Sequence, residues 1–104
     1  VDWTNVTASV GLGPTSIAGL GVMDAQMVHD TNRQCAVLFG GRTPNGTFPT
    51  DTWQYDGVRW ALVATSGPPS RTRFCMAMDT VRNKPVIYGG VNGAFTVFFH
   101  DTWS

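Results

Sequence analysis

The sequence predicts an all-β protein, and its composition and an internal repeat are the observations that predict it. The 104 residues contain no Glu and one Lys, so two residue types that favour exposed helical surfaces are almost missing. Thirteen Thr, 12 Gly and 6 Pro favour strands and tight turns instead. A segment of about 50 residues also occurs twice, which is typical of architectures built from stacked supersecondary units.

The repeat contains a double glycine that ends an apolar run. Residues 37–41, VLFGG, return 49 positions later as residues 86–90, VIYGG. The similarity starts ten residues earlier and ends at the Asp-Thr-Trp triplets 51–53 and 101–103. The offset of these triplets is 50, so one loop residue separates two otherwise parallel copies.

We expect four short antiparallel strands in each unit. In the first unit, alternating residues place the first strand at 21–30, and the apolar run is the second. The third strand carries residues 51–55 and the fourth carries 59–63, with the strong hairpin signal Asp56-Gly57 between them. The continuous hydrophobicity of the second strand predicts burial on both of its faces.

The glycine pairs end the second strand of each unit. Glycine adopts a positive φ without the clash that a Cβ would cause, so we expect these pairs to turn the chain sharply and to admit a neighbouring backbone. Residues 43–49 and 91–99 then form loops, and these loops differ most between the two units.

The order of these features resembles the kelch repeat. The resemblance is carried by the apolar run, the glycine pair, Tyr55 and Trp60 spaced as a strand pair, and the linker Pro68-Pro69-Ser70-Arg71. It covers residues 21 to 103, whereas the first linker, residues 13–17, lacks the Arg. The resemblance implies a β-propeller of four-stranded blades, related in fold to the propeller domain of galactose oxidase.

One chain holds two such blades, and the second is incomplete. Blade 1 is expected at residues 21–64 and blade 2 at 71–104, where no fourth strand follows the last Trp. Residues 1–8 contain a Trp followed by alternating residues, like residues 60–63, and are predicted to complete the blade of a neighbouring subunit. The residues assigned to this closure are Val1, Trp3, Val6 and Trp103.

Two blades alone would expose apolar faces and unpaired strand edges. The predicted resolution is a cyclic, head-to-tail homo-oligomer with an even number of blades. A trimer with six blades is favoured over a tetramer with eight, because six is a common size for kelch propellers. The alternative is that the chain is a fragment of a longer propeller.

Composition argues against two classes of partner. The net charge is zero and no basic stripe is present, which argues against nucleic acid. No apolar run approaches the length of about 18 residues that a membrane-spanning helix needs. Cys35 and Cys75 are not at equivalent positions of the repeat, so both are expected to be buried, reduced thiols, and the compartment stays undetermined.

The residues that could carry catalysis or bind a metal show no site pattern. His29 aligns with Met78, which favours a packing role, and His100 has no second ligand at metal spacing. Most Asp residues recur in both units and are assigned to turns and strand edges. We therefore expect no catalytic residue, no metal and no cofactor, and the resemblance to galactose oxidase extends to the fold alone.

The loops after the glycine pairs are the candidate binding site, because loops on repeat scaffolds carry function. Phe98 aligns with Phe48 and is assigned a structural role, whereas Phe95 and Phe99 have no aromatic counterpart. The alternative for Phe95 and Phe99 is inward packing in an extended third strand. The candidate ligand-binding residues are Arg42, Asn45, Asn92, Phe95, Phe99 and His100.

The predicted function is a non-enzymatic, self-assembling propeller scaffold that presents these loops to a protein partner. The alternative is a multivalent, lectin-like ring in which exposed aromatics stack on sugars and Arg42, Asn45 and Asn92 supply hydrogen bonds. An oxidase-like enzyme is a third interpretation.

Overall fold

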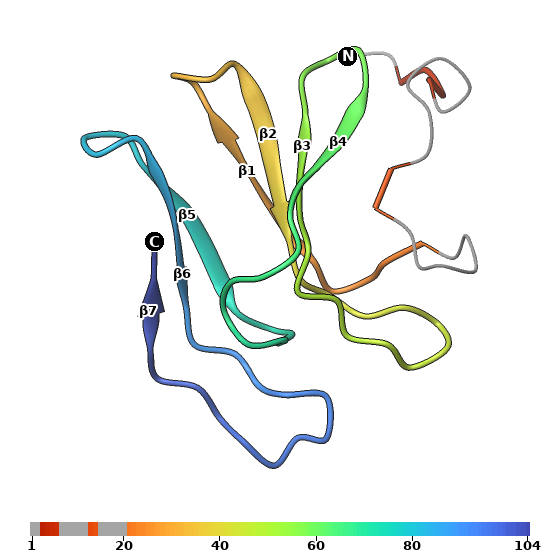
Figure 1. The fold of residues 1–104 in the computed structure, drawn as a ribbon, viewed down its shortest axis with the longest axis vertical. Helices are drawn as coiled ribbons and strands as arrows, with labels where there is room; N and C mark the ends of the chain where they lie inside the picture. The colour runs from red at the N-terminus through yellow and green to blue at the C-terminus, as the bar shows by residue number, and fades with distance from the viewer. Residues whose placement is uncertain (1–2, 7–12, 15–20) are drawn as a thin grey trace.

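The structure is a computed structural model that describes residues 3–6, 13–14 and 21–104. The described residues form two antiparallel sheets (Figure 1). They include no helix that is long and apolar enough to cross a membrane. The first sheet has the order β1 (Gln26–Asp30), β2 (Cys35–Phe39), β3 (Thr52–Tyr55) and β4 (Trp60–Ala64), and the second has the order β5 (Cys75–Asp79), β6 (Lys84–Tyr88) and β7 (Thr102–Trp103). The all-β class is therefore confirmed.

Aspartates close the β1–β2 and β5–β6 hairpins. Asp30 Oδ1 accepts hydrogen bonds from the backbone N–H groups of Asn32 (3.0 Å) and Arg33 (3.1 Å), and the Arg33 guanidinium lies 2.6 Å from Oδ2. Asp79 makes the same set of bonds in the second unit. The hydrogen bonds from Arg33 hold the pKa of Asp30 below its usual range. These carboxylates thus form turns, as the sequence predicts.

The Asp56-Gly57 hairpin forms as predicted and joins β3 to β4. Gly57 has a φ of 94°, and Asp56 Oδ1 accepts hydrogen bonds from the backbone N–H groups of the two residues after Gly57, at 2.8 and 2.9 Å. The turn places Tyr55 opposite Trp60, with ring centroids 5.1 Å apart. The aromatic pair therefore packs across the hairpin that the turn defines.

The glycine pairs admit a neighbouring backbone, as the sequence predicts. Gly41 has a φ of 91°, and a Cβ on it would lie 2.6 Å from the carbonyl oxygen of Met23. The second unit repeats this approach between Gly90 and Thr72, at 2.8 Å. A side chain at either position would push the opposite backbone away, so glycine is needed for space as well as for its φ.

The first strand is shorter than predicted. We expect it at residues 21–30 from the sequence, but β1 begins at Gln26. Met23 makes only an isolated bridge to Arg42, and Asp24 follows it with a φ of 59°. This left-handed residue bends the chain and interrupts the ladder, which is why regular pairing starts later.

The two sheets pack face to face, and alternation along the strands gives each sheet a front face and a back face. The front face of the first sheet packs on the back face of the second. Phe39 from the front face packs with Ile87 and Met76 from the back face, whereas Val37 and Trp103 line an opening between the two sheets. Phe39 and Phe74 meet edge to face at the centre of the contact, with ring centroids 5.8 Å apart. This interface is the core that holds the two units together.

The second sheet has an open edge at β7. The strand contains two residues, and within the described part of the chain only β6 pairs with it. Figure 1 shows residues 3–6, in red, on the β4 side of the molecule and away from β7. These residues form no strand here, and the rest of the predicted 1–8 strand lies outside the described residues.

The two cysteines differ in exposure, which corrects the expectation that both are buried. Both thiols are free, and Cys35 on β2 is buried while Cys75 on β5 is exposed. Burial raises the pKa of the Cys35 thiol. Cys75 is exposed because it lies on the front face of the second sheet, which no described segment covers.

Candidate functional site

The two loops that follow the glycine pairs lie at one end of the sheets (Figure 1). They meet at the Phe48 ring, which lies so close to Gly93 that a Cβ there would overlap it. The first unit therefore contacts the second at this end through an aromatic ring set against bare backbone.

Each loop is closed by the side chain that begins it. Thr43 Oγ1 accepts a hydrogen bond from the Thr47 backbone N–H at 3.1 Å. Asn92 Oδ1 accepts hydrogen bonds from the backbone N–H groups of Thr96 (2.9 Å) and Val97 (3.0 Å), and Asn92 Nδ2 donates to Thr96 Oγ1 at 3.0 Å. The Asn92 amide, predicted to bind a ligand, is thus occupied within its own loop.

The predicted residues Arg42 and Asn45 are engaged by neighbours in the first unit. Arg42 Nε lies 3.1 Å from Asp24 Oδ2 in an exposed ion pair. Asn45 is exposed, and its Oδ1 accepts a hydrogen bond from the Thr43 hydroxyl. The polar part of the predicted site therefore divides between two loops, and each part is held by local contacts.

Phe95 combines exposure with a backbone conformation that is unusual for its residue type. It is 47% exposed and has a φ of 57°. The equivalent residue of the first loop is Gly46, with a φ of 85°. A positive φ costs a residue with a Cβ roughly 1 kcal/mol. A bulky aromatic side chain therefore stands where the loop backbone favours glycine.

Arg73 is a candidate that the sequence prediction missed. Its guanidinium carbon lies 5.0 Å from the centroid of the Phe95 ring, and the residue is exposed. None of the ion pairs among the described residues includes it. Alignment of the two units contains a signal for it, because Arg73 stands opposite Asp24 and reverses the charge at that position.

Phe99 belongs to a buried cluster. Its ring centroid lies 4.0 Å from the guanidinium carbon of Arg71, a completely buried residue. Arg71 donates to both carboxylate oxygens of Asp101 (2.7 and 3.0 Å), to the Gly89 carbonyl (2.9 Å) and to the Pro69 carbonyl (3.1 Å). The Phe99 ring thus packs inside the second unit, although residues 95–99 lie before β7 and do not form the extended strand of the inward-packing alternative.

The same cluster controls the charge of Asp101. Hydrogen bonds from Arg71 and from Trp103 Nε1 (2.7 Å) hold the pKa of Asp101 well below its usual range. Asp101 is therefore ionised at neutral pH and balances the buried guanidinium, which a low-dielectric environment requires.

Phe98 differs from its counterpart in the first unit. Phe48 is half-buried against Gly93, whereas Phe98 is 74% exposed. Its neighbour Val97 is also exposed, as is the predicted ligand-binding residue His100. Residues 95 to 98 therefore form an exposed, largely apolar stretch at the loop end of the molecule.

The residues predicted to close a ring are described in part. Val1 lies outside the described residues. Trp3 and Val6 are 94% and 46% exposed, and Trp103 on β7 is 39% exposed. Trp103 is thus accessible from the open edge of the second sheet.

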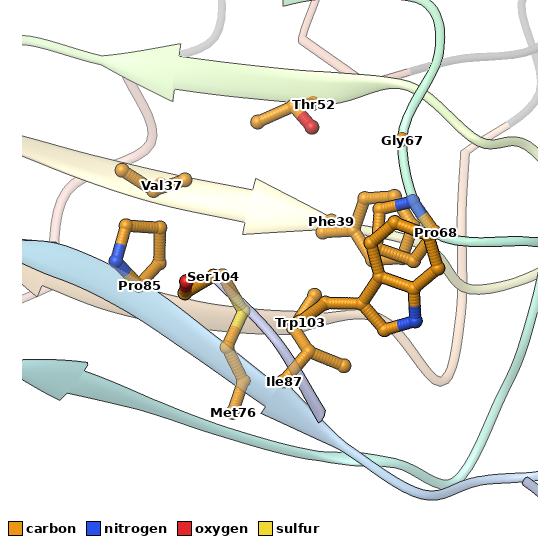
Figure 2. Close-up of a pocket in the computed structure, with 10 residues that line it drawn as sticks. All are labelled: Val37, Phe39, Thr52, Gly67, Pro68, Met76, Pro85, Ile87, Trp103 and Ser104. Carbon is orange, nitrogen blue, oxygen red and sulfur yellow. The ribbon is translucent and has the colours of Figure 1, made fainter. Parts of the chain in front are cut away.

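A cavity of about 340 Å³ opens between the two sheets beside Trp103 (Figure 2). Figure 2 shows the Trp103 indole next to Pro68 at one end, and Pro85 across from Val37 at the other. The side chains that line it include no charged group. The cavity therefore offers apolar surface, and no charged partner, to whatever occupies it.

Within the described part of the chain, no three His, Cys, Asp or Glu side chains converge as metal ligands would. His29 is exposed on the back face of the first sheet, although its alignment with Met78 predicts packing. Comparisons of the chain with protein-family models, with curated proteins and with solved structures find no match.

Proposed function

We propose that the chain is a non-enzymatic, self-assembling scaffold of kelch-like propeller blades that presents its loops to a protein partner. The observation that carries the binding role is Phe95. Residues held in sparsely populated backbone conformations cluster at functional sites. Glycine is present at the equivalent position, so the aromatic side chain is retained against the preference of the backbone.

The surroundings of Phe95 favour a protein as the partner. Phe95 and Val97 are 47% and 48% exposed, and the Arg73 guanidinium faces the Phe95 ring. Aromatic residues and Arg are the types that contribute most binding energy at protein interfaces. The Asn92 amide, which could recognise a sugar hydroxyl, is already bonded within the loop.

Two features support self-assembly. The outer edge of β7 has no partner among the described residues, and an open edge is a template for another strand. Each sheet also keeps one face that the other does not cover, with Met27 (55%) and Tyr88 (53%) exposed. A ring in which each subunit completes the next would cover both features, and a trimer would give six blades.

The binding role is tested with Phe95→Gly and, as a control in the same loop, Ala94→Gly. Peptides are selected from a displayed random library on the wild-type protein and then measured on both variants. Phe95→Gly should change the free energy of unfolding by no more than about 1 kcal/mol, because the relief of backbone strain offsets the lost contact with Arg73. The selected peptides should lose affinity at least tenfold for Phe95→Gly and keep it for Ala94→Gly.

Three results would count against a protein-binding loop. Equal affinity of the peptides for wild type and Phe95→Gly would remove the assigned role. A large loss of stability would make Phe95 a packing residue. A failed peptide selection, with glycan binding that Phe95→Gly abolishes, would favour the lectin-like alternative instead.

A further inference from the structure

We propose that the exposed front face of the second sheet docks on the exposed back face of the first sheet of another copy. The contact would repeat, between chains, the packing that joins the two sheets within one chain. This proposal rests on the self-assembly proposed above. It identifies which surface of one chain meets which surface of the next.

The internal interface supplies the template. Its front-face residues Val37 and Phe39 have the repeat equivalents Val86 and Tyr88, which lie on the uncovered front face of the second sheet. Its back-face residues Met76, Ile87 and Trp103 have the equivalents Met27, Leu38 and Trp53, on the back face of the first sheet. Met27 is 55% exposed there, while Leu38 and Trp53 are half-buried beside Pro14. Each chain therefore carries both halves of an interface that already forms once inside it.

The chemistry of the two free faces matches that of the covered ones. At equivalent positions of the two units, the back faces carry Met and Met, Leu and Ile, and Trp and Trp. The front faces carry Val and Val, and Phe and Tyr. Met27, Leu62 and Tyr88 are 55%, 46% and 53% exposed. Apolar side chains gathered on one sheet face mark an interaction surface, and here the surface that already packs on such a face within the chain belongs to the equivalent repeat unit.

The hairpin ends carry a second element of the template. Arg33 Nη1 donates to the Asn83 carbonyl oxygen at 3.3 Å, which links the turn of the first unit to the turn of the second. The repeat equivalents are Arg82 and Gln34. The Arg82 side chain is 75% exposed, and Gln34 has a φ of 55°, close to the 56° of Asn83. Gln34 and Asn83 thus both have a left-handed φ at the same position of their turns.

The loop end carries a third element, with one difference. Phe48 packs on Gly93 across the internal interface, and its equivalent Phe98 is 74% exposed. The residue equivalent to Gly93 is Pro44, which is also exposed. Because Pro44 has a ring where Gly93 has none, the Phe98 ring would lie flat on the pyrrolidine and not over a bare Cα.

Residues 13–14 lie against the back face of the first sheet. A Cβ on Gly13 would lie 2.8 Å from the Trp60 indole nitrogen, and Pro14 lies in a small cavity with Trp53. Both Trp residues are on the back face of the first sheet. Residues 13–14 thus cover part of this back face, and the second sheet of another copy would dock beside them, over Met27 on β1.

Such a contact is heterologous, because two different surfaces meet, and this makes a sharp test possible. Met27→Lys blocks the back face and Tyr88→Lys blocks the front face. Both residues are more than half exposed in one chain, so each variant should fold, which circular dichroism checks. Val58→Lys, at a 63% exposed position in the β3–β4 turn, is the control. The mass of each protein is measured by light scattering.

Each face variant alone should have the mass of one chain, 11.3 kDa, while the control should assemble like the wild type. An equimolar mixture of the two face variants should form dimers and nothing larger, because one intact front face remains for one intact back face. If Tyr88→Lys fails to fold, Ala77→Arg on the same face replaces it.

The outcomes separate this inference from the assembly itself. A wild-type protein that is monomeric would overturn both. Wild-type assembly that neither face variant weakens would overturn the face-to-face contact and leave self-assembly standing. A mixture that stays monomeric would show that the two surfaces do not meet each other.

Discussion

Arg71 shows how a completely buried charge is accommodated in the second unit. A buried guanidinium is costly unless its donors are paired and its charge is balanced. Here Asp101 provides two acceptors, the Gly89 and Pro69 carbonyls provide two more, and the Phe99 ring packs against the plane of the group. The first unit has Val22 at the equivalent position, so this device belongs to one unit of the repeat.

The ionisation of Asp101 should make the free energy of unfolding depend on pH in the acidic range. Its pKa in the folded protein lies below the ordinary aspartate value of 3.8, so its contribution to stability is fully present above that pH. The contribution is lost as the pH falls toward the folded-state pKa, because the unfolded chain binds the proton more readily. Asp101→Asn should therefore lower stability at neutral pH and flatten the fall of stability below pH 3.8.

The measurement is urea unfolding, followed by tryptophan fluorescence, at several pH values between neutral and strongly acidic. Trp103→Phe removes the second donor to Asp101 while Arg71 stays, so its pH dependence should lie between those of wild type and Asp101→Asn. If the free energy of unfolding changes with pH in the same way for wild type and Asp101→Asn, Arg71 and Trp103 do not lower the pKa of Asp101 in the folded protein.

The glycine pairs set the geometry at the level of the strand. They end β2 and β6, and they bring the segments before β1 and β5 close enough to bond with the chain after the pair. Met23 and Arg42 exchange two backbone hydrogen bonds of 2.8 Å, and Thr72 and Val91 exchange bonds of 2.9 and 3.0 Å. Gly41 and Gly90 thus let backbone pairing continue beyond the regular strands of each sheet, toward the loop end.

Two glycine substitutions separate the effect of φ from the effect of space. Gly41 and Gly57 have nearly the same φ, 91° and 94°, but only Gly41 has a backbone atom within reach of a Cβ. Gly57→Ala should cost about 1 kcal/mol in the free energy of unfolding, from its conformation alone. Gly41→Ala should cost about 2 kcal/mol more, because the Met23 carbonyl must move. Equal costs in urea unfolding would mean that the close approach is unimportant.

At the scale of the whole molecule, exposed apolar side chains occur on the two outer faces and at the loop end, where Met27, Tyr88 and Phe98 are 55%, 53% and 74% exposed. The internal interface involves one face of each sheet, and the opposite faces keep exposed apolar residues such as Met27 and Tyr88. Burial of such faces stabilises a folded chain by roughly 25 cal/mol for each Å² of apolar surface removed from water. Assembly would therefore add to the stability of each subunit.

Stability should for this reason depend on protein concentration. If folding is linked to assembly, each tenfold rise in concentration should stabilise a subunit by about 1 kcal/mol, and the melting temperature should rise with it. Met27→Lys should melt at a temperature that does not change with concentration. Differential scanning calorimetry across a hundredfold range of concentration tests this, and a constant melting temperature for the wild type would contradict linked assembly.

Much of the fold is predictable because its signals are local. The Asp56-Gly57 turn and the turn aspartates Asp30 and Asp79 follow from residue chemistry within a few positions. The shortened first strand is less visible in the sequence, because it depends on the left-handed φ of Asp24 beside a bridge from Met23 to the distant Arg42. The candidate site is harder still, since Phe95 and Phe99 look alike in the sequence and differ in what covers them.

By itself, the sequence determined the all-β class, the two repeated units, the order of strands and the positions of the turns. These depend on periodicity and on the backbone preferences of Gly, Asp and Pro, which act over a few residues. Only the tertiary structure decided that Phe99 packs against Arg71, that Phe95 and Cys75 are exposed, and which sheet faces meet. Those outcomes depend on contacts between segments far apart in the chain, such as Arg71 with Asp101 and Phe48 with Gly93, and no local pattern specifies them.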